Sequence, residues 1–175
     1  MQALSKQEVA QNVSALQEQI RQAAAAAGRD PAQVRLMAVT KTVDPELVNA
    51  AIDAGINLLG ENKAQELCAK YDSYHKDGVE IHFIGHLQTN KVRQIVDKVQ
   101  MIESVDSLPL AEEINKRCAA LNKQMPILIE VNIGREESKS GVLPEDLPAL
   151  LEEISKLPAV SVRGLMAIPP VCENN

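Results

Sequence analysis

The hydrophobic positions at the start of the chain follow a helical period. Ser5 followed by Glu8 makes a capping-box pattern, and Gly28 has the place of a residue just beyond a helix C-terminus. Between them, apolar residues recur every three or four positions and therefore share one helix face: Val9, Val13, Leu16, Ile20 and Ala24. The pattern predicts an amphipathic helix over about 5–28.

From there the chain alternates between short apolar runs and segments of helical period. The apolar runs predict buried strands at 34–40, 56–60, 81–85, 101–105, 127–133 and 162–168. One helix is expected from Asp44 as cap and Pro45 as first residue to Gly55 just past its end. The other helices are expected at about 62–74, 89–96, 107–121 and 144–156.

Continuous apolar strands that alternate with helices indicate a parallel sheet covered by helices. Both a doubly wound sheet and a (β/α)8 barrel fit this alternation. Polar residues follow nearly every strand, and a barrel brings all carboxyl ends to one mouth, so the barrel is favoured. We therefore expect an α/β protein with a TIM-type barrel and an extra N-terminal helix. The barrel, at 34–175, is incomplete after six strands within a single domain, 1–175.

Composition narrows the classes of function. The 175 residues are 45% hydrophobic and 24% charged, as in ordinary globular proteins, but aromatic residues make up only 2%. A net charge of −6 and few aromatic rings argue against a nucleic-acid partner. The sequence shows no secretory signal and no span of membrane length. Three dispersed cysteines, Cys68, Cys118 and Cys172, indicate a reducing cytoplasm rather than a disulfide framework.

Among the residues at strand ends, Lys41 is the strongest candidate for chemistry. It closes an apolar strand, where partial desolvation would favour a neutral, nucleophilic amine that forms Schiff bases. The alternative is that Lys41 extends into solvent or pairs with Asp44. Position alone does not choose between the two.

The other candidate motifs are weaker. His82 and His86 are four residues apart and would share a strand face, but no third metal ligand stands at a convincing spacing. We expect no metal site. Lys139 lies in a glycine-containing loop after the fifth strand, where a solvated lysine is the simpler interpretation. Glycine-rich nucleotide-binding motifs and the GxSxG motif of serine hydrolases are absent.

Six motifs together resemble one known family. They are AVTKTVDPE around Lys41, GENKAQE at 60–66, HFIGHLQTNK at 82–91, ESVDS at 103–107, EVNIGREESKSG at 130–141 and RGLMAIPP at 163–170. In this order they resemble the pyridoxal phosphate homeostasis proteins, relatives of the N-terminal barrel of alanine racemase. The likeness extends from about residue 36 to the end of the chain.

The resemblance implies that Lys41 forms a Schiff base with pyridoxal 5′-phosphate (PLP). Asn62, His86, Asn132 and Met166 match motif positions at the barrel mouth, and we infer that they contact the cofactor. His86 could equally cap the helix that follows it. The implied function is to bind, buffer or deliver PLP, with apo-PLP enzymes as recipients and no established catalytic reaction. No catalytic residue is assigned. Whether Lys91 or Lys139 forms a secondary adduct stays open.

One departure from the family concerns the end of the chain. The family continues beyond RGLMAIPP to strands that hold the cofactor phosphate, whereas this sequence stops at Asn175. We therefore expect weak or no PLP retention. We expect a monomer for a full-length protein, with self-association through open barrel edges for this chain. The rival functions are a PLP-dependent racemase-like enzyme and a doubly wound binding module without a cofactor.

Overall fold

The computed structural model describes residues 4–170, which build a six-stranded parallel sheet. The strands pair in chain order, so each strand lies between its sequence neighbours. A doubly wound sheet would reverse direction at a switch point, whereas sequential order is that of a barrel wall, which confirms the predicted fold class. The strands are β1 (Ala38–Val39), β2 (Leu58–Glu61), β3 (Glu80–Phe83), β4 (Met101–Val105), β5 (Met125–Glu130) and β6 (Val160–Met166).

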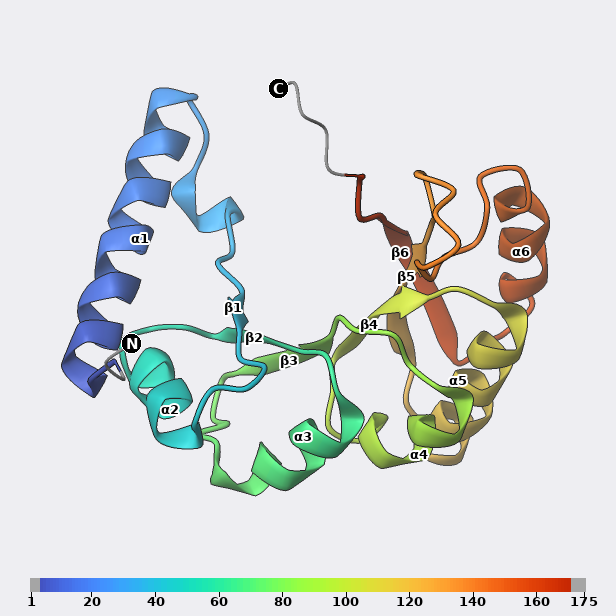
Figure 1. Cartoon of the computed structure of the whole chain (residues 1–175), viewed down its shortest axis with the longest axis horizontal. Helices are drawn as coiled ribbons and strands as arrows, with labels where there is room; N and C mark the ends of the chain where they lie inside the picture. The colour runs from blue at the N-terminus through green and yellow to red at the C-terminus, as the bar shows by residue number, and fades with distance from the viewer. Residues whose placement is uncertain (1–3, 171–175) are drawn as a thin grey trace.

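Helices cover the outer side of this curved sheet. Figure 1 shows α2 to α6 following the sheet from β1 towards β6, with α1 upright beside α2 at one end. No helix of residues 4–170 is long and apolar enough to cross a membrane. The helices are α1 (Lys6–Ala26), α2 (Pro45–Asp53), α3 (Ala64–Lys70), α4 (Val92–Ile95), α5 (Leu108–Ala120) and α6 (Leu147–Ile154).

The predicted helix ends are present in the structure. Ser5 and Glu8 form both hydrogen bonds of a capping box at the start of α1. Gly28 adopts a φ of 66°, as a residue beyond a helix C-terminus does. Asp44 caps α2 by accepting a hydrogen bond of 2.9 Å from the backbone N–H of Glu46. These signals act within one helical turn, and for that reason they are legible in the sequence.

The core lies between the sheet and the helices. In β2, β3, β4 and β5, alternate side chains are almost completely buried. Each such aliphatic or aromatic side chain contributes about 1.5–3 kcal/mol by leaving water. The largest fully buried residues of this layer include Leu59, Phe83, Ile102, Ile127 and Ile129 from the strands and Leu67, Ile95, Leu110, Ile114 and Ile154 from the helices.

The first predicted strand is wrong in length and in burial. A buried strand is expected at 34–40, but only Ala38–Val39 pair as β1, after a 3-10 turn at Pro31–Gln33. Val34 and Val39 are 38% and 49% exposed. Among the described strands β1 pairs only with β2, so it has hydrogen-bond partners on one side only and little cover over its inner face.

Other predicted boundaries differ by a few residues. The helix expected at 62–74 is α3 followed by a 3-10 turn, Tyr71–Ser73, and the one expected at 89–96 begins as a 3-10 turn, Thr89–Lys91. The fifth strand ends at Glu130 instead of residue 133. The next residue, Val131, forms an isolated parallel bridge with Val142, because the loop between them folds back onto the strand end.

Candidate functional site

A pocket of about 410 Å³ lies where the carboxyl ends of the strands meet. Its lining comes from segments that follow or end β1, β2, β3, β5 and β6, as at the mouth of a barrel. The structure therefore brings together three of the residues proposed from the sequence, Lys41, Asn62 and His86. Polar neighbours in the lining that sequence reasoning did not assign to the site are Glu130, Ser138 and Ser140, together with Lys139.

Lys41 occupies a tight turn directly after β1. The backbone N–H of Val43 donates a hydrogen bond of 3.1 Å to the carbonyl of Thr40 and closes the turn. Thr40 is buried, whereas Lys41 is exposed and has no ion pair within residues 4–170. The desolvation expected at Lys41 is therefore not provided by the described residues, because its turn lies on the open side of the sheet.

A buried carboxylate anchors the residue before Lys41. Glu61 is fully buried, and its Oε1 accepts hydrogen bonds from Thr40 Oγ1 at 2.6 Å and from Tyr74 Oη at 2.7 Å. Burial, followed by the neighbouring Glu61 carboxylate, raises the pKa of Tyr74 well above its ordinary value, so the hydroxyl stays a donor. The strand end that carries Lys41 is thus tied to β2 through side chains as well as through the sheet.

Asn62 lies at the floor of the pocket beside Gly85. Its Oδ1 is buried and has no hydrogen-bond partner within residues 4–170. A Cβ atom at Gly85 would lie 2.3 Å from the carbonyl oxygen of Asn62, so only glycine allows the two strand ends to approach this closely. Sequence reasoning missed the role of Gly85, although a glycine directly after an apolar strand is a recognisable signal.

His86 and Glu130 are two ionisable residues of the pocket lining. His86 Nδ1 lies 3.4 Å from Asp106 Oδ2 and 3.0 Å from Ser140 Oγ. Glu130 is 7% exposed, and its carboxylate has no hydrogen bond or ion pair in the described part of the chain. Burial, and then the negative charge of Asp106, raises the pKa of Glu130 above its ordinary value. Sequence reasoning did not assign Glu130 to the site.

Asn132 and Met166 lie away from the pocket lining. The Asn132 amide donates a hydrogen bond of 2.9 Å to the Glu136 carbonyl and accepts one of 3.2 Å from its N–H. Met166 accepts a hydrogen bond of 2.8 Å from the Val131 backbone through its own carbonyl. In this structure both residues organise the strand end and the loop that carries Lys139.

The two histidines considered as a metal pair have separate environments. His82 is buried on β3, with Nδ1 2.6 Å from Glu103 Oε1 and Nε2 3.4 Å from Glu80 Oε2. His86 contacts a different carboxylate at the pocket. Within residues 4–170 no group of three or more histidine, cysteine or acidic side chains is arranged to hold a metal ion.

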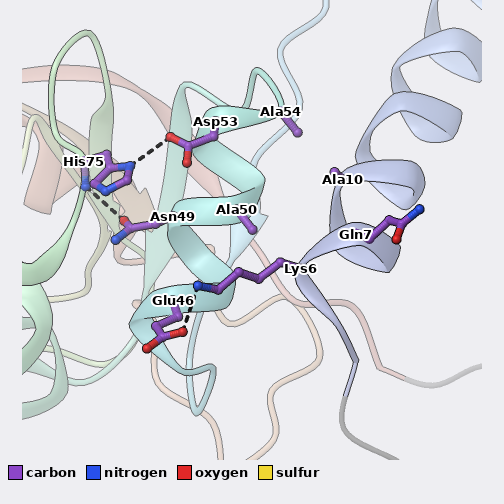
Figure 2. Close-up of a pocket in the computed structure, with 9 residues that line it drawn as sticks. All are labelled: Lys6, Gln7, Ala10, Glu46, Asn49, Ala50, Asp53, Ala54 and His75. Atoms are coloured by element: carbon purple, nitrogen blue, oxygen red, sulfur yellow. Dashed lines mark hydrogen bonds and ion pairs between the residues drawn. The ribbon is translucent and has the colours of Figure 1, made fainter.

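A larger cleft of about 640 Å³ lies between α1 and α2 (Figure 2). Its charged groups are paired: Lys6 Nζ lies 2.8 Å from Glu46, and His75 Nδ1 lies 2.8 Å from Asp53. None of the residues proposed from the sequence lines it. The charged groups that line this cleft therefore already have partners.

The sheet order and the polar mouth define a class of proteins with a racemase-type barrel. Residues 11–175 match the family described as alanine racemase, N-terminal domain. An alanine racemase from Clostridium difficile superimposes with a TM-score of 0.66 over 79% of this chain and 36% of the racemase, at 14% identity. At that identity the likeness shows a shared fold.

Two relatives with higher sequence identity than the racemase show which family within this class the chain belongs to. The pyridoxal phosphate homeostasis protein of Aquifex aeolicus is 44% identical over 164 residues, which are 94% of this chain and 72% of the relative. The structure of PipY from Synechococcus elongatus with PLP bound is 32% identical, with a TM-score of 0.74 over 89% of this chain and 72% of that chain. The chain belongs to the pyridoxal phosphate homeostasis protein family.

Proposed function

We propose that this chain binds pyridoxal 5′-phosphate at the barrel mouth and acts in PLP homeostasis by binding, buffering or delivering the cofactor. The observation that carries the proposal is the meeting of Lys41, Asn62 and Glu130 in one pocket at the carboxyl ends of the strands. Family membership supports it, as does PLP in the structure of PipY. The pocket volume of about 410 Å³ is within the range of small-molecule sites.

The residues present fit such a ligand. A buried Asn62 Oδ1 without a hydrogen-bond partner is costly unless a ligand supplies a donor, and Asn62 belongs to the pocket lining together with Glu130. PLP, when bound, supplies an aldehyde that condenses with a lysine amine and a ring that withdraws electrons. We assign covalent attachment to Lys41, because its amine is exposed at the pocket and free of any ion pair among residues 4–170.

The neighbouring side chains have supporting roles in this proposal. Asn62 orients the ligand through its amide, and His86 lies at the rim, held by Asp106 and Ser140. Asn132 and Met166 act indirectly through the strand end and loop that they hold. Lys139 lines the same pocket, so it is the nearest second amine to be tested for an adduct.

We propose that the protein is not itself an enzyme. Racemisation needs a second acid/base on the opposite face of the cofactor, and in racemases an additional β-domain supplies it. The names of the curated relatives agree with a homeostasis role. Exchange of the α-proton of an added amino acid with solvent at enzymatic turnover would replace this proposal with the racemase-like alternative.

The remaining proposals concern the cellular compartment of the protein and the molecules that it binds. We place the protein in the cytoplasm, supported by the free thiols of Cys68 and Cys118. Apo-PLP enzymes are the proposed recipients, and nucleic acid is not a proposed partner because the net charge is −6. We propose self-association through β1 and β6, since these are the edge strands of the described sheet.

The test is capture of PLP by the 175-residue chain. One equivalent of PLP is added, the absorption spectrum is recorded, borohydride is added, and the modified residue is located by peptide mass spectrometry. Because retention by this chain is expected to be weak, the expected result is a small change in the absorption spectrum, with an adduct on Lys41 once borohydride has trapped it. Lys41→Ala should lose both signals, whereas Lys116→Ala, which changes an exposed lysine on α5, should keep them. An unchanged spectrum and adduct in Lys41→Ala would overturn the assignment of Lys41.

A further inference from the structure

The turn that carries Lys41 has a strained backbone. Thr42 adopts a φ of 60°, in the left-handed region that β-branched residues avoid. Such a conformation persists only where surrounding contacts enforce it, and it is common at functional sites. Contacts around this turn must therefore hold Thr42 in the left-handed conformation.

Two side chains of α3 hold this turn from the helix side. Glu66 Oε1 accepts a hydrogen bond of 2.5 Å from the backbone N–H of Thr42. Lys70 Nζ donates a hydrogen bond of 3.3 Å to the carbonyl of Thr40. Glu66 and Lys70 also form an ion pair with each other. The pair thus contacts the residue before Lys41 and the residue after it.

This arrangement differs from an ordinary helix-surface ion pair. Exposed pairs four residues apart contribute little, but the side chains of Lys70 and Glu66 are only 14% and 18% exposed. The Lys70 ammonium, and then the Thr42 N–H, lower the pKa of Glu66, so its carboxylate stays charged as an acceptor at neutral pH. Glu66 belongs to the GENKAQE motif at 60–66 and does not line the pocket.

We propose that Glu66 and Lys70 are positioning residues that fix the turn of Lys41 and thereby direct its amine into the pocket. The inference rests on the proposed function, because it concerns the amine that attaches PLP. Neither side chain lines the pocket, so each acts through the backbone of Thr40 or Thr42. A reacting group displaced by even a small distance loses much of its reactivity, which gives the pair a measurable effect.

The first measurement needs no cofactor. In the 175-residue chain without PLP, the Thr42 amide proton should be protected from hydrogen exchange and shifted downfield by its charged acceptor. Glu66→Ala should remove both features. Glu66→Gln keeps an acceptor without the charge and should give an intermediate result. Glu113→Ala, which breaks the ion pair of Glu113 with Arg117 on α5, is the matched control and should leave Thr42 unchanged.

The second measurement is the initial rate of borohydride-trapped adduct formation on Lys41. Glu66→Ala should slow it by about tenfold or more, Lys70→Arg should stay close to the unchanged chain, and Glu113→Ala should have no effect. Thr42→Gly adopts the positive φ without side-chain strain. Glu66→Ala should therefore have a smaller effect on the rate in the Thr42→Gly background.

The outcomes separate the two proposals. If the unchanged chain forms no adduct on Lys41, the proposed function fails, and the positioning role fails with it even if Thr42 is protected. If the adduct forms on Lys41 at equal rates in the unchanged chain and Glu66→Ala, only the positioning role is refuted. Circular dichroism establishes folding, and where Glu66→Ala is unfolded, Glu66→Gln decides: an unchanged Thr42 amide and an unchanged rate would refute the role.

Discussion

Gly85 provides a direct test of the packing beneath the pocket. In Gly85→Ala the new methyl carbon would lie 2.3 Å from the Asn62 carbonyl oxygen, 2.7 Å from its Cβ and 2.8 Å from its Cα. Two of these three atoms are backbone, so rotation of a flexible side chain does not relieve the contact. The strand end after β2 or the one after β3 must move.

The size of the effect follows from two opposing contributions. Forcing a methyl group into a packed site costs about 1–3 kcal/mol, and three contacts under 3.0 Å place this site in the upper half of that range. Alanine also restricts the unfolded chain, which returns about 0.4–1 kcal/mol. We expect a net loss of about 1–2.6 kcal/mol in the free energy of unfolding, together with weaker PLP capture because Asn62 is displaced.

The assay is urea unfolding followed by far-ultraviolet circular dichroism, since the chain has no tryptophan. Gly164→Ala on β6 is the control, because a Cβ there meets only Leu128 Cδ2 at 3.4 Å, an ordinary contact. The control should lose no stability. Unchanged stability in Gly85→Ala, or an equal loss in Gly164→Ala, would refute the argument from close approach.

Three further substitutions test other parts of the structure by the same unfolding assay. Tyr74→Phe removes one of two donors to the buried Glu61 carboxylate and should cost about 1.5–3 kcal/mol. Lys123→Met removes two hydrogen bonds that Lys123 Nζ donates, one of 2.9 Å to the Val96 carbonyl and one to the Val99 carbonyl. It should lower the free energy of unfolding by about 1–2 kcal/mol. Glu130→Gln should raise stability at pH 7, and the gain should vanish below about pH 4.

The sign of the pH effect follows from the raised pKa of Glu130. Between the ordinary carboxyl pKa and the raised one, the folded state holds a proton that the unfolded state has released. Stability therefore falls as pH rises through this window, and glutamine removes the loss. A constant difference between Glu130→Gln and the unchanged chain at all pH values would contradict this account. Tyr71→Phe is the control for Tyr74→Phe, and Lys116→Met is the control for Lys123→Met. Neither control should lower the free energy of unfolding by a comparable amount.

Much of the local structure was predictable from short-range signals. The capping box of Ser5 and Glu8, the positive φ of Gly28 and the cap by Asp44 depend on neighbours within a turn, so the residues themselves specify them. The placement of polar residues after each strand also predicted that Lys41, Asn62 and His86 would meet, because parallel strands bring their carboxyl ends to one edge.

The sequence by itself therefore determined the order of strands and helices, the N-terminal caps of α1 and α2, and the residues available at the mouth. The tertiary structure decided what those residues contact. It showed that strands neighbour one another in chain order, that Asn132 pairs with Glu136 and that Glu66 and Lys70 hold the turn of Lys41. These contacts join segments whose distance depends on how the whole sheet curves and packs, and no local propensity encodes that distance.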